Sequence, residues 1–276
     1  MANILKGKDV AEYIDNLSIE DIKKRLNPCL AIFKVGNKDN DSAYEKGIDK
    51  KAAKLGIKVV KYNFELDVEP NTFYNELDKA NNDKNIHGIL VFRPLPKQLD
   101  EALLNKHISF KKDVDACLDE SLAGVIIGSN KTFAPCTAQA VIELLDYYNI
   151  DVKGKNVVVL GRSLVIGKPV SMLLLKKDAT VTICHSKTKD LKKICQNADI
   201  LVCATGQMES ITKEYTNVNQ TIIDVGINFN EVKNKLCGDV LFEDVEPNVK
   251  NITPVPGGVG SITTSILLRH VVLASH

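Results

Sequence analysis

The chain has 276 residues, of which 44% are hydrophobic and 26% are charged. This composition excludes the disordered, collagen-like and disulfide-scaffold classes, and it provides enough apolar residues for one large core or two smaller ones. The 36 lysine and arginine residues nearly balance the 35 aspartate and glutamate residues, so the chain lacks the net positive field that draws proteins to nucleic acid or membranes. A small molecule is therefore the expected partner.

Targeting and metal-binding patterns are missing from the sequence. Charged residues interrupt positions 1–16, where a signal peptide has its apolar core, and no run approaches the ~20 apolar residues of a membrane span. The seven cysteines form no C-x-x-C pair and the five histidines lack ligand spacing. This predicts reduced, mostly buried thiols and no metal site. We expect a cytoplasmic protein.

The first half of the chain alternates short β-branched runs with amphipathic segments. Strands are predicted at 29–36, 57–64 and 87–96, and helices at 41–55, 70–82 and 97–106. Alternation of this kind is typical of βαβ units, so it predicts a mostly parallel sheet.

A second series of the same kind follows a predicted helix at 138–150. As in a dinucleotide-binding half-fold, its strands are predicted at 155–161, 179–186, 198–206 and 220–226. An amphipathic segment at 261–276 predicts a last helix, which could pack on either half. The predicted fold class is therefore α/β, with two domains.

The turn after the strand at 155–161 is the first candidate site. Gly161 ends this strand and Gly167 precedes an apolar helical run, so backbone N–H groups there can approach a pyrophosphate. The spacing is G-x5-G rather than G-x-G-x-x-G, and a plain structural turn is the alternative.

The end of the next strand bears on the choice of cofactor. A Rossmann domain that selects NAD has an acidic residue there, which binds the ribose 2′-hydroxyl. This strand instead ends near Ser186 and Lys187, which together with Arg162 suit a 2′-phosphate. NADP is therefore favoured over NAD. The alternative is that both basic residues are ordinary surface charges.

Motifs along nearly the whole chain carry a resemblance to a known family. They lie at 161–169 (GRSLVIGKP), 179–188, 198–206, 224–228 (DVGIN), 238–240 (GDV) and 253–263 (TPVPGGVGSIT), and upstream at 42–57, 88–96, 112–116 and 133–140. In this order the motifs resemble those of the methylenetetrahydrofolate dehydrogenase/cyclohydrolase family.

The resemblance implies two α/β domains with a cleft between them. The N-terminal folate-binding catalytic domain would comprise residues 1–139 and 262–276, and the C-terminal Rossmann-type NADP-binding domain residues 140–261. A homodimer is implied as well, with a final helix that packs on the N-terminal domain. The family's dehydrogenase step oxidises 5,10-methylenetetrahydrofolate to 5,10-methenyltetrahydrofolate by hydride transfer. Its cyclohydrolase step hydrates that product to 10-formyltetrahydrofolate.

The resemblance also assigns roles to individual residues. Tyr44 and Asp115 match its catalytic residues, and an aromatic ring and a carboxylate suit the folate ring system and the parallel donors of a pterin. The substrate contacts are these two residues and Val91, Pro256, Gly257 and Gly258. The cofactor contacts fall on Gly161, Arg162, Ser163, Ile166, Ser186, Lys187, Ala204, Gly206, Ile227 and Thr263.

This sequence departs from the family at positions that matter for hydration. The family has a lysine one helical turn after the tyrosine and a glutamine in its V-Q-L-P-L-P run, where this chain has Ile48 and Phe92. Neither apolar side chain can orient water or transfer protons, whereas hydride transfer mostly requires two rings held in register. Ala116 also replaces a family glycine, which indicates a reshaped folate pocket. We therefore hypothesise an NADP-dependent dehydrogenase whose cyclohydrolase activity is weak or absent.

Three alternatives stay open. One is a fully bifunctional enzyme that produces 10-formyltetrahydrofolate, with water activated by Asp115 or by a lysine from elsewhere. Another is a non-catalytic protein that binds NADP or folate. The third is a different small-substrate dehydrogenase of the shikimate type. Tetrahydrofolate derivatives are the expected substrates, with a modified folate or another reduced pterin as the alternative.

Overall fold

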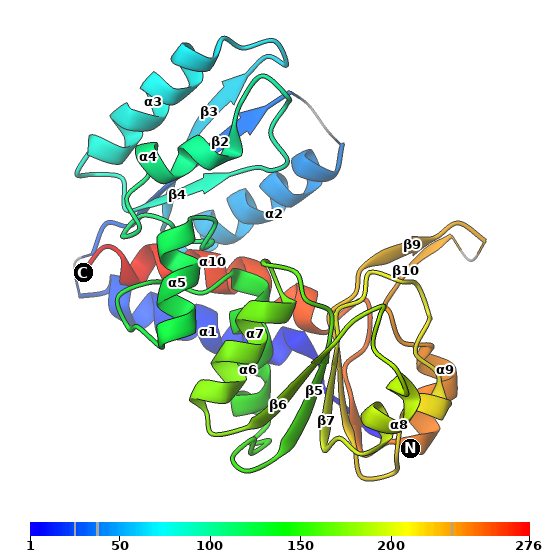
Figure 1. Cartoon of the computed structure of the whole chain (residues 1–276). Helices are drawn as coiled ribbons and strands as arrows, with labels where there is room; N and C mark the ends of the chain where they lie inside the picture. Colours follow the sequence, from blue (N-terminus) through cyan, green and yellow to red (C-terminus); the bar gives the residue numbers. More distant parts are fainter. Residues whose placement is uncertain (25, 37–38, 233) are drawn as a thin grey trace. The chain divides into compact units, whose positions relative to one another are not determined.

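The computed structural model describes residues 1–24, 26–36, 39–232 and 234–276 (Figure 1). It forms two compact units, each with its own parallel sheet. The six-stranded unit comprises Met1–Ala11 and Thr137–Thr263, and the three-stranded unit comprises Glu12–Cys136 and Thr264–His276. These boundaries differ by two or three residues from the expected ones at 139 and 262. The first eleven residues also group with the six-stranded unit, because their strand extends its sheet.

The six-stranded sheet has the order β1-β11-β8-β7-β5-β6, and every neighbouring pair is parallel. Its strands are β1 (Asn3–Ile4), β5 (Asn156–Leu160), β6 (Thr180–Cys184), β7 (Ile200–Cys203), β8 (Thr221–Asp224) and β11 (Asn251–Ile252). Four of them were predicted, and each is one to three residues shorter at its ends than predicted. An antiparallel hairpin of β9 (Asn228–Asn230) and β10 (Lys235–Cys237) was not predicted.

Apolar strands and amphipathic helices build the core of this unit. β7 and β8 are buried along their whole length, as expected for central strands of a parallel sheet with covered faces. Leu160, Leu201 and Ile222 belong to this core. The helices are α6 (Cys136–Tyr147), α7 (Gly167–Lys176), α8 (Leu191–Gln196) and α9 (Phe242–Val245).

The three-stranded unit has the parallel order β3-β2-β4. Its elements include β2 (Cys29–Val35), α2 (Asp39–Leu55), β3 (Lys58–Phe64), α3 (Pro70–Asn82), β4 (Gly88–Val91), α4 (Leu104–His107) and α5 (Asp119–Ile127). The strand predicted at 87–96 ends at Val91, because the prolines at 94 and 96 cannot donate to a strand ladder. The helix predicted at 97–106 is instead a 3-10 turn at Glu101–Leu103 followed by α4.

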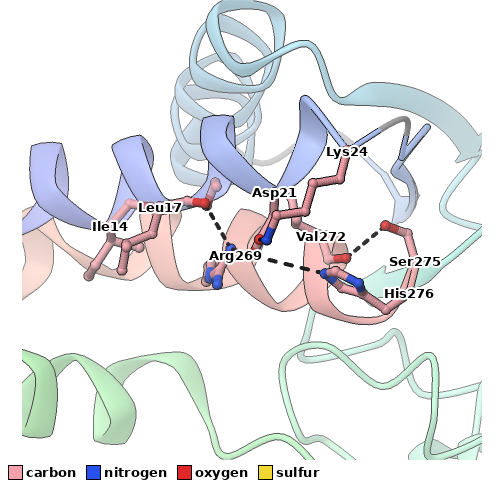
Figure 2. Close-up of polar contacts among 9 residues, drawn as sticks. Ile14, Leu17, Asp21, Lys24, Arg269, Val272, Ser275 and His276 are labelled. Carbon is pink, nitrogen blue, oxygen red and sulfur yellow. Dashed lines mark hydrogen bonds and ion pairs between the residues drawn. The ribbon is translucent and has the colours of Figure 1, made fainter.

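The last helix packs on a first helix that was not predicted. α1 (Gly7–Ile22) buries Val10, Ile14 and Ser18, which recur every four residues along one face. Arg269 of α10 (Thr263–Leu273) donates from Nη1 to the Leu17 carbonyl oxygen at 3.2 Å and pairs with Asp21 Oδ2 at 2.6 Å (Figure 2). These contacts join α10 to α1 within the three-stranded unit, where the resemblance places the last helix.

The burial of the cysteines and the length of the helices bear on two predictions made from the sequence. Six of the seven cysteines are buried and Cys117 is half-buried, as predicted. Across the described parts of the chain, no helix combines the length and the apolar character that crossing a membrane requires.

Candidate functional site

A pocket of about 400 Å³ opens at the carboxyl ends of β5, β6 and β7. Five predicted cofactor contacts line it: Gly161, Arg162, Ser163, Ser186 and Ala204. The remaining lining residues are Leu160, Cys184, His185, Leu191, Thr205, Gln207, Ser210, Ile211 and Tyr215. In a parallel α/β sheet, this edge is where ligands bind.

The turn between β5 and α7 is built around two glycines. Gly161 has φ +128°, and a Cβ there would lie 2.2 Å from the Ala204 carbonyl oxygen. A Cβ on Gly167 would lie 2.2 Å from the Gly161 carbonyl oxygen, so α7 begins tightly against this turn. The Ser163 hydroxyl accepts hydrogen bonds from the N–H groups of Ile166 at 3.1 Å and Gly167 at 3.4 Å. The turn thereby presents Arg162 and Ser163 to the pocket.

The turn after β6 supplies the second polar wall. His185 Nδ1 accepts a hydrogen bond from the Lys187 N–H at 3.2 Å, and the His185 N–H donates to Thr188 Oγ1 at 2.9 Å. Ser186 is exposed on the pocket wall between them, whereas Lys187 is exposed outside the lining. A guanidinium and hydroxyl groups together form a donor set that suits a phosphate.

Several residues of this pocket were not predicted from the sequence. His185 could have been found, because it directly precedes Ser186 in the same turn. Tyr215 could not, because it reaches the pocket from the 3-10 turn Lys213–Tyr215, between β7 and β8. No local pattern marks that turn as part of a site.

A second pocket of about 230 Å³ lies in the same unit. It is lined by the turn after β8, by Leu236 of β10 and by the proline- and glycine-rich segment before α10, which bring together Gly226, Ile227, Leu236 and 254–258. The predicted contacts Ile227, Pro256, Gly257 and Gly258 are therefore neighbours in space. Gly257 has φ +101°, which favours glycine.

Four predicted cofactor contacts line neither pocket: Ile166, Lys187, Gly206 and Thr263. The backbone N–H of Ile166 donates the hydrogen bond to the Ser163 hydroxyl. Thr263 donates from Oγ1 to the Gly260 carbonyl oxygen at 3.1 Å. Gly206 has φ +66°, and no atom lies within 4 Å of a Cβ built on it.

In the three-stranded unit, Tyr44 and Phe92 lie against each other. Their ring centroids are 5.8 Å apart, and the Tyr44 side chain on α2 is 39% exposed. Burial of the Tyr44 hydroxyl raises its pKa. Ile48, one helical turn further along α2, is completely buried, and Val91 is buried at the end of β4. At the two substituted family positions, Ile48 is therefore an apolar residue of the core, and Phe92 is an apolar residue beside Tyr44.

Asp115 occupies a turn that other groups of this unit hold in place. Its Oδ1 accepts a hydrogen bond from the Cys136 N–H at 3.4 Å, and burial raises the pKa of its carboxyl group. Hydrogen bonds from Cys136 and the positive charge of Arg93 oppose this rise. The next residue, Ala116, has φ +51°, a conformation that glycine adopts without strain. Arg93 was not singled out from sequence, although it directly follows Phe92.

The described residues contain no group of three or more histidine, cysteine, aspartate or glutamate side chains placed to hold a metal ion.

Comparisons with known proteins point to one family. A family model described as tetrahydrofolate dehydrogenase/cyclohydrolase, catalytic domain, matches residues 5–115, and the NAD(P)-binding domain model of the same family matches residues 135–276. The chain is 48% identical over 279 residues to the Bifunctional protein FolD of Clostridium botulinum, covering 100% of this chain and 99% of that protein.

Solved structures of the same kind are similar as well. The FolD structure from Campylobacter jejuni has a TM-score of 0.95 at 34% identity, covering 100% of this chain and 99% of that one. The FolD of Trypanosoma brucei, complexed with NADP cofactor and inhibitor, has a TM-score of 0.90 at 33% identity, covering 99% and 97%.

Proposed function

Since this chain belongs to the tetrahydrofolate dehydrogenase/cyclohydrolase family, we propose that it is an NADP-dependent 5,10-methylenetetrahydrofolate dehydrogenase. Hydride transfer to the cofactor gives 5,10-methenyltetrahydrofolate, a step of one-carbon metabolism.

The pocket at the ends of β5 and β6 carries the choice of NADP. Arg162, Ser163 and Ser186 are all exposed on its wall. No acidic residue is found among the described residues that line it, so nothing there repels a 2′-phosphate. The NADP complex of the related T. brucei structure supports the same choice.

The chain's own residues bind and orient the cofactor. When bound, NADP supplies the acceptor for a hydride. Arg162 and Ser186 hold the 2′-phosphate in this proposal, and Gly161 with Ser163 shapes the turn beside the pyrophosphate. The other contacts are Ile166, Lys187, Ala204, Gly206, Ile227 and Thr263.

Tyr44 and Asp115 are the proposed catalytic residues. The Tyr44 ring, which already lies on Phe92, offers a flat surface for the folate ring system. Asp115 accepts hydrogen bonds from the pterin and so fixes its orientation. Val91, Pro256, Gly257 and Gly258 complete the proposed substrate contacts. Orientation of two rings is the main requirement of hydride transfer.

We propose that hydration of the product is weak or absent. Its support is the pair of apolar residues at the lysine and glutamine positions: Ile48 is completely buried and Phe92 packs on Tyr44. Arg93 contributes a positive charge near Asp115, but a guanidinium stays protonated in proteins and therefore cannot transfer a proton.

A fully bifunctional enzyme is the second candidate. Its support is the printed name of the C. botulinum relative, a bifunctional protein with 48% identity to this chain. In that case Asp115, whose pKa is raised by burial, would exchange protons with water. The product would then be 10-formyltetrahydrofolate.

The test of the dehydrogenase proposal compares two cofactors. Purified protein receives 5,10-methylenetetrahydrofolate with NADP or NAD, and formation of 5,10-methenyltetrahydrofolate is followed by absorbance. We expect kcat/KM for NADP to exceed that for NAD about tenfold or more, since a charge-assisted phosphate contact contributes at least ~1.4 kcal/mol. Equal values would contradict the NADP preference. Binding without oxidation would instead favour the non-catalytic alternative.

We also propose that this protein forms a homodimer and that it is located in the cytoplasm. None of the seven cysteines, all of which lie in the described residues, is in a disulfide, which suits a reducing compartment.

A further inference from the structure

Two buried aspartates lie at or next to the pockets of the six-stranded unit: Asp224 lines the second pocket, and Asp239 contacts turns that border both. Asp224 is the last residue of β8 and is 3% exposed, and Asp239, two residues after β10, is completely buried. Neither residue was singled out from the sequence as a functional candidate. Burying a carboxylate is costly unless hydrogen bonds compensate, so the donors that they meet indicate their role.

Asp239 connects two turns that line different pockets. Its Oδ2 accepts hydrogen bonds from the N–H groups of Thr205 at 2.6 Å and Gly206 at 3.1 Å, in the turn after β7. Its Oδ1 accepts one from Asn228 Nδ2 at 3.1 Å. Thr205 lines the first pocket, and Asn228 directly follows Ile227, which lines the second. One side chain therefore fixes the distance between these turns.

Asp224 in turn holds Asp239. Its Oδ1 accepts hydrogen bonds from the N–H groups of Gly226 at 2.9 Å and Asp239 at 3.1 Å, and its Oδ2 accepts one from the Val240 N–H at 2.9 Å. Burial raises the pKa of Asp224 to about 7, although these backbone bonds oppose the rise. The second aspartate therefore fixes the backbone that carries the first.

Glycines make this close approach possible. A Cβ on Gly226 would lie 2.3 Å from Asp239 Oδ1, and a Cβ on Gly238 would lie 1.9 Å from Asp224 Oδ2. Real Cβ atoms do not approach oxygen so closely, so any side chain at these positions would displace the carboxylates. The two glycines and the two aspartates therefore form one unit of structure.

A stabilising role alone explains this arrangement poorly, because well-packed apolar residues often stabilise a core as well as buried charges do. The bonds of Asp239 go to turns that face the pockets. We propose that Asp239 is a positioning residue, which sets the turn after β7 against the turn after β8 for the nicotinamide half of the cofactor, and that Asp224 holds it in place. This inference rests on the proposed NADP-dependent function.

The test uses Asp239→Asn in the full chain. Asparagine keeps one acceptor oxygen and presents an amide NH2 to the other donors, so one of the two turns loses its tether. We expect the Kd for NADP to rise about tenfold or more, as for a buried charge-assisted bond. The Kd for 2′,5′-ADP should rise much less, because Thr205 lines the same pocket but Arg162 and Ser186 lie in turns that Asp239 does not contact.

Two further variants keep this test decisive. Asp199→Asn is the control, because Asp199 Oδ2 also accepts a backbone hydrogen bond, from the Asn156 N–H at 2.8 Å, at the opposite edge of the same sheet. It should change neither affinity. Asn228→Ala removes the tether from its other end and leaves both carboxylates intact. It should weaken NADP binding, and its effect should not add to that of Asp239→Asn.

Titration calorimetry distinguishes the outcomes. Equal loss of NADP and 2′,5′-ADP binding in Asp239→Asn would show that Asp239 only supports the fold. If that variant does not fold, unchanged NADP binding by Asn228→Ala would overturn the inference. Wild-type protein that binds no NADP would contradict the proposed function instead.

Discussion

Ile48 and Phe92 make the sharpest prediction at the scale of single residues. Ile48 is completely buried and Phe92 packs on the Tyr44 ring. Ile48→Lys alone would bury an ammonium group, whereas Ile48→Lys with Phe92→Gln restores both polar residues that the family has at these positions. We expect the double variant to hydrolyse 5,10-methenyltetrahydrofolate about tenfold or more faster than the wild type, since a positioned proton-transfer group contributes that much.

The matched control is the double variant Ile48→Met with Phe92→Leu, which disturbs packing equally and introduces no polar group. NADP-dependent oxidation is measured in every variant to show that the site is intact. If the lysine–glutamine variant oxidises normally and hydrolyses no faster than the methionine–leucine variant, these two positions do not control hydration.

At the scale of elements, α10 is tied to the Asp115 turn by a histidine. His270 Nδ1 donates to the Val114 carbonyl oxygen at 2.8 Å, and its ring stacks on Phe133 with a centroid distance of 4.5 Å. Burial lowers the pKa of His270 from 6.5 to about 4. The His270 imidazole therefore binds a proton more readily in the unfolded chain than in the folded chain. As a consequence, folding stability falls as pH decreases from about 6.5 to about 4.

His270→Asn tests that linkage. Asparagine can donate from Nδ2 to the same carbonyl oxygen but does not titrate. The free energy of unfolding of the wild type should fall by up to about 3 kcal/mol more than that of the variant between neutral pH and pH 4, given ~1.4 kcal/mol per pKa unit. Denaturant melts at several pH values measure this difference.

His276→Asn is the matched control, at the exposed end of the chain after the same helix. Its stability should follow the wild type across the pH range. A constant stability difference between wild type and His270→Asn would show that His270 is not the titrating group.

At the scale of the whole molecule, we propose that two copies associate through the β9–β10 hairpin. Phe229, Val232 and Leu236 are 56%, 97% and 44% exposed there, and clustered exposed apolar side chains commonly mark an interface. Light scattering should give about twice the chain mass of 30.4 kDa. Phe229→Ser with Leu236→Ser should shift the protein to monomers.

The control changes apolar surface elsewhere. Ile126 and Ile127 of α5 are 67% and 80% exposed, and replacing both by serine should leave the dimer intact. A monomeric wild type, or dissociation by the α5 variant instead of the hairpin variant, would contradict this interface.

The sequence predicted the alternation of strands and helices better than it predicted the two shortest strands of the six-stranded sheet. Central strands such as β5 and β7 are short apolar runs between turn residues, so local pattern suffices. β1 and β11 have two residues each and pair across 248 positions, from Asn3 to Asn251. No periodicity can arise in so short a strand. α1 did carry a helical pattern at Val10, Ile14 and Ser18, and could have been found.

The candidate site shows the same division between local and distant signals. Gly161, Arg162 and Ser186 were predicted because they end or follow recognisable strands, and Ser163 was predicted from the family resemblance. Asp239 was not, since its bonds to Thr205 and Asn228 depend on how three separate turns meet at one edge of the sheet. Tertiary contacts of that kind leave no spacing rule in the sequence.

We propose that this chain transfers a hydride and that it accelerates the hydration that follows weakly or not at all. The most direct test presents purified protein with 5,10-methenyltetrahydrofolate and compares its hydrolysis with the spontaneous rate. The same preparation oxidises 5,10-methylenetetrahydrofolate with NADP alongside, as the activity control. We predict active oxidation and hydrolysis at or close to the spontaneous rate. Accelerated hydrolysis together with oxidation would contradict the claim, and the chain would then be a bifunctional enzyme that hydrates without a lysine at position 48.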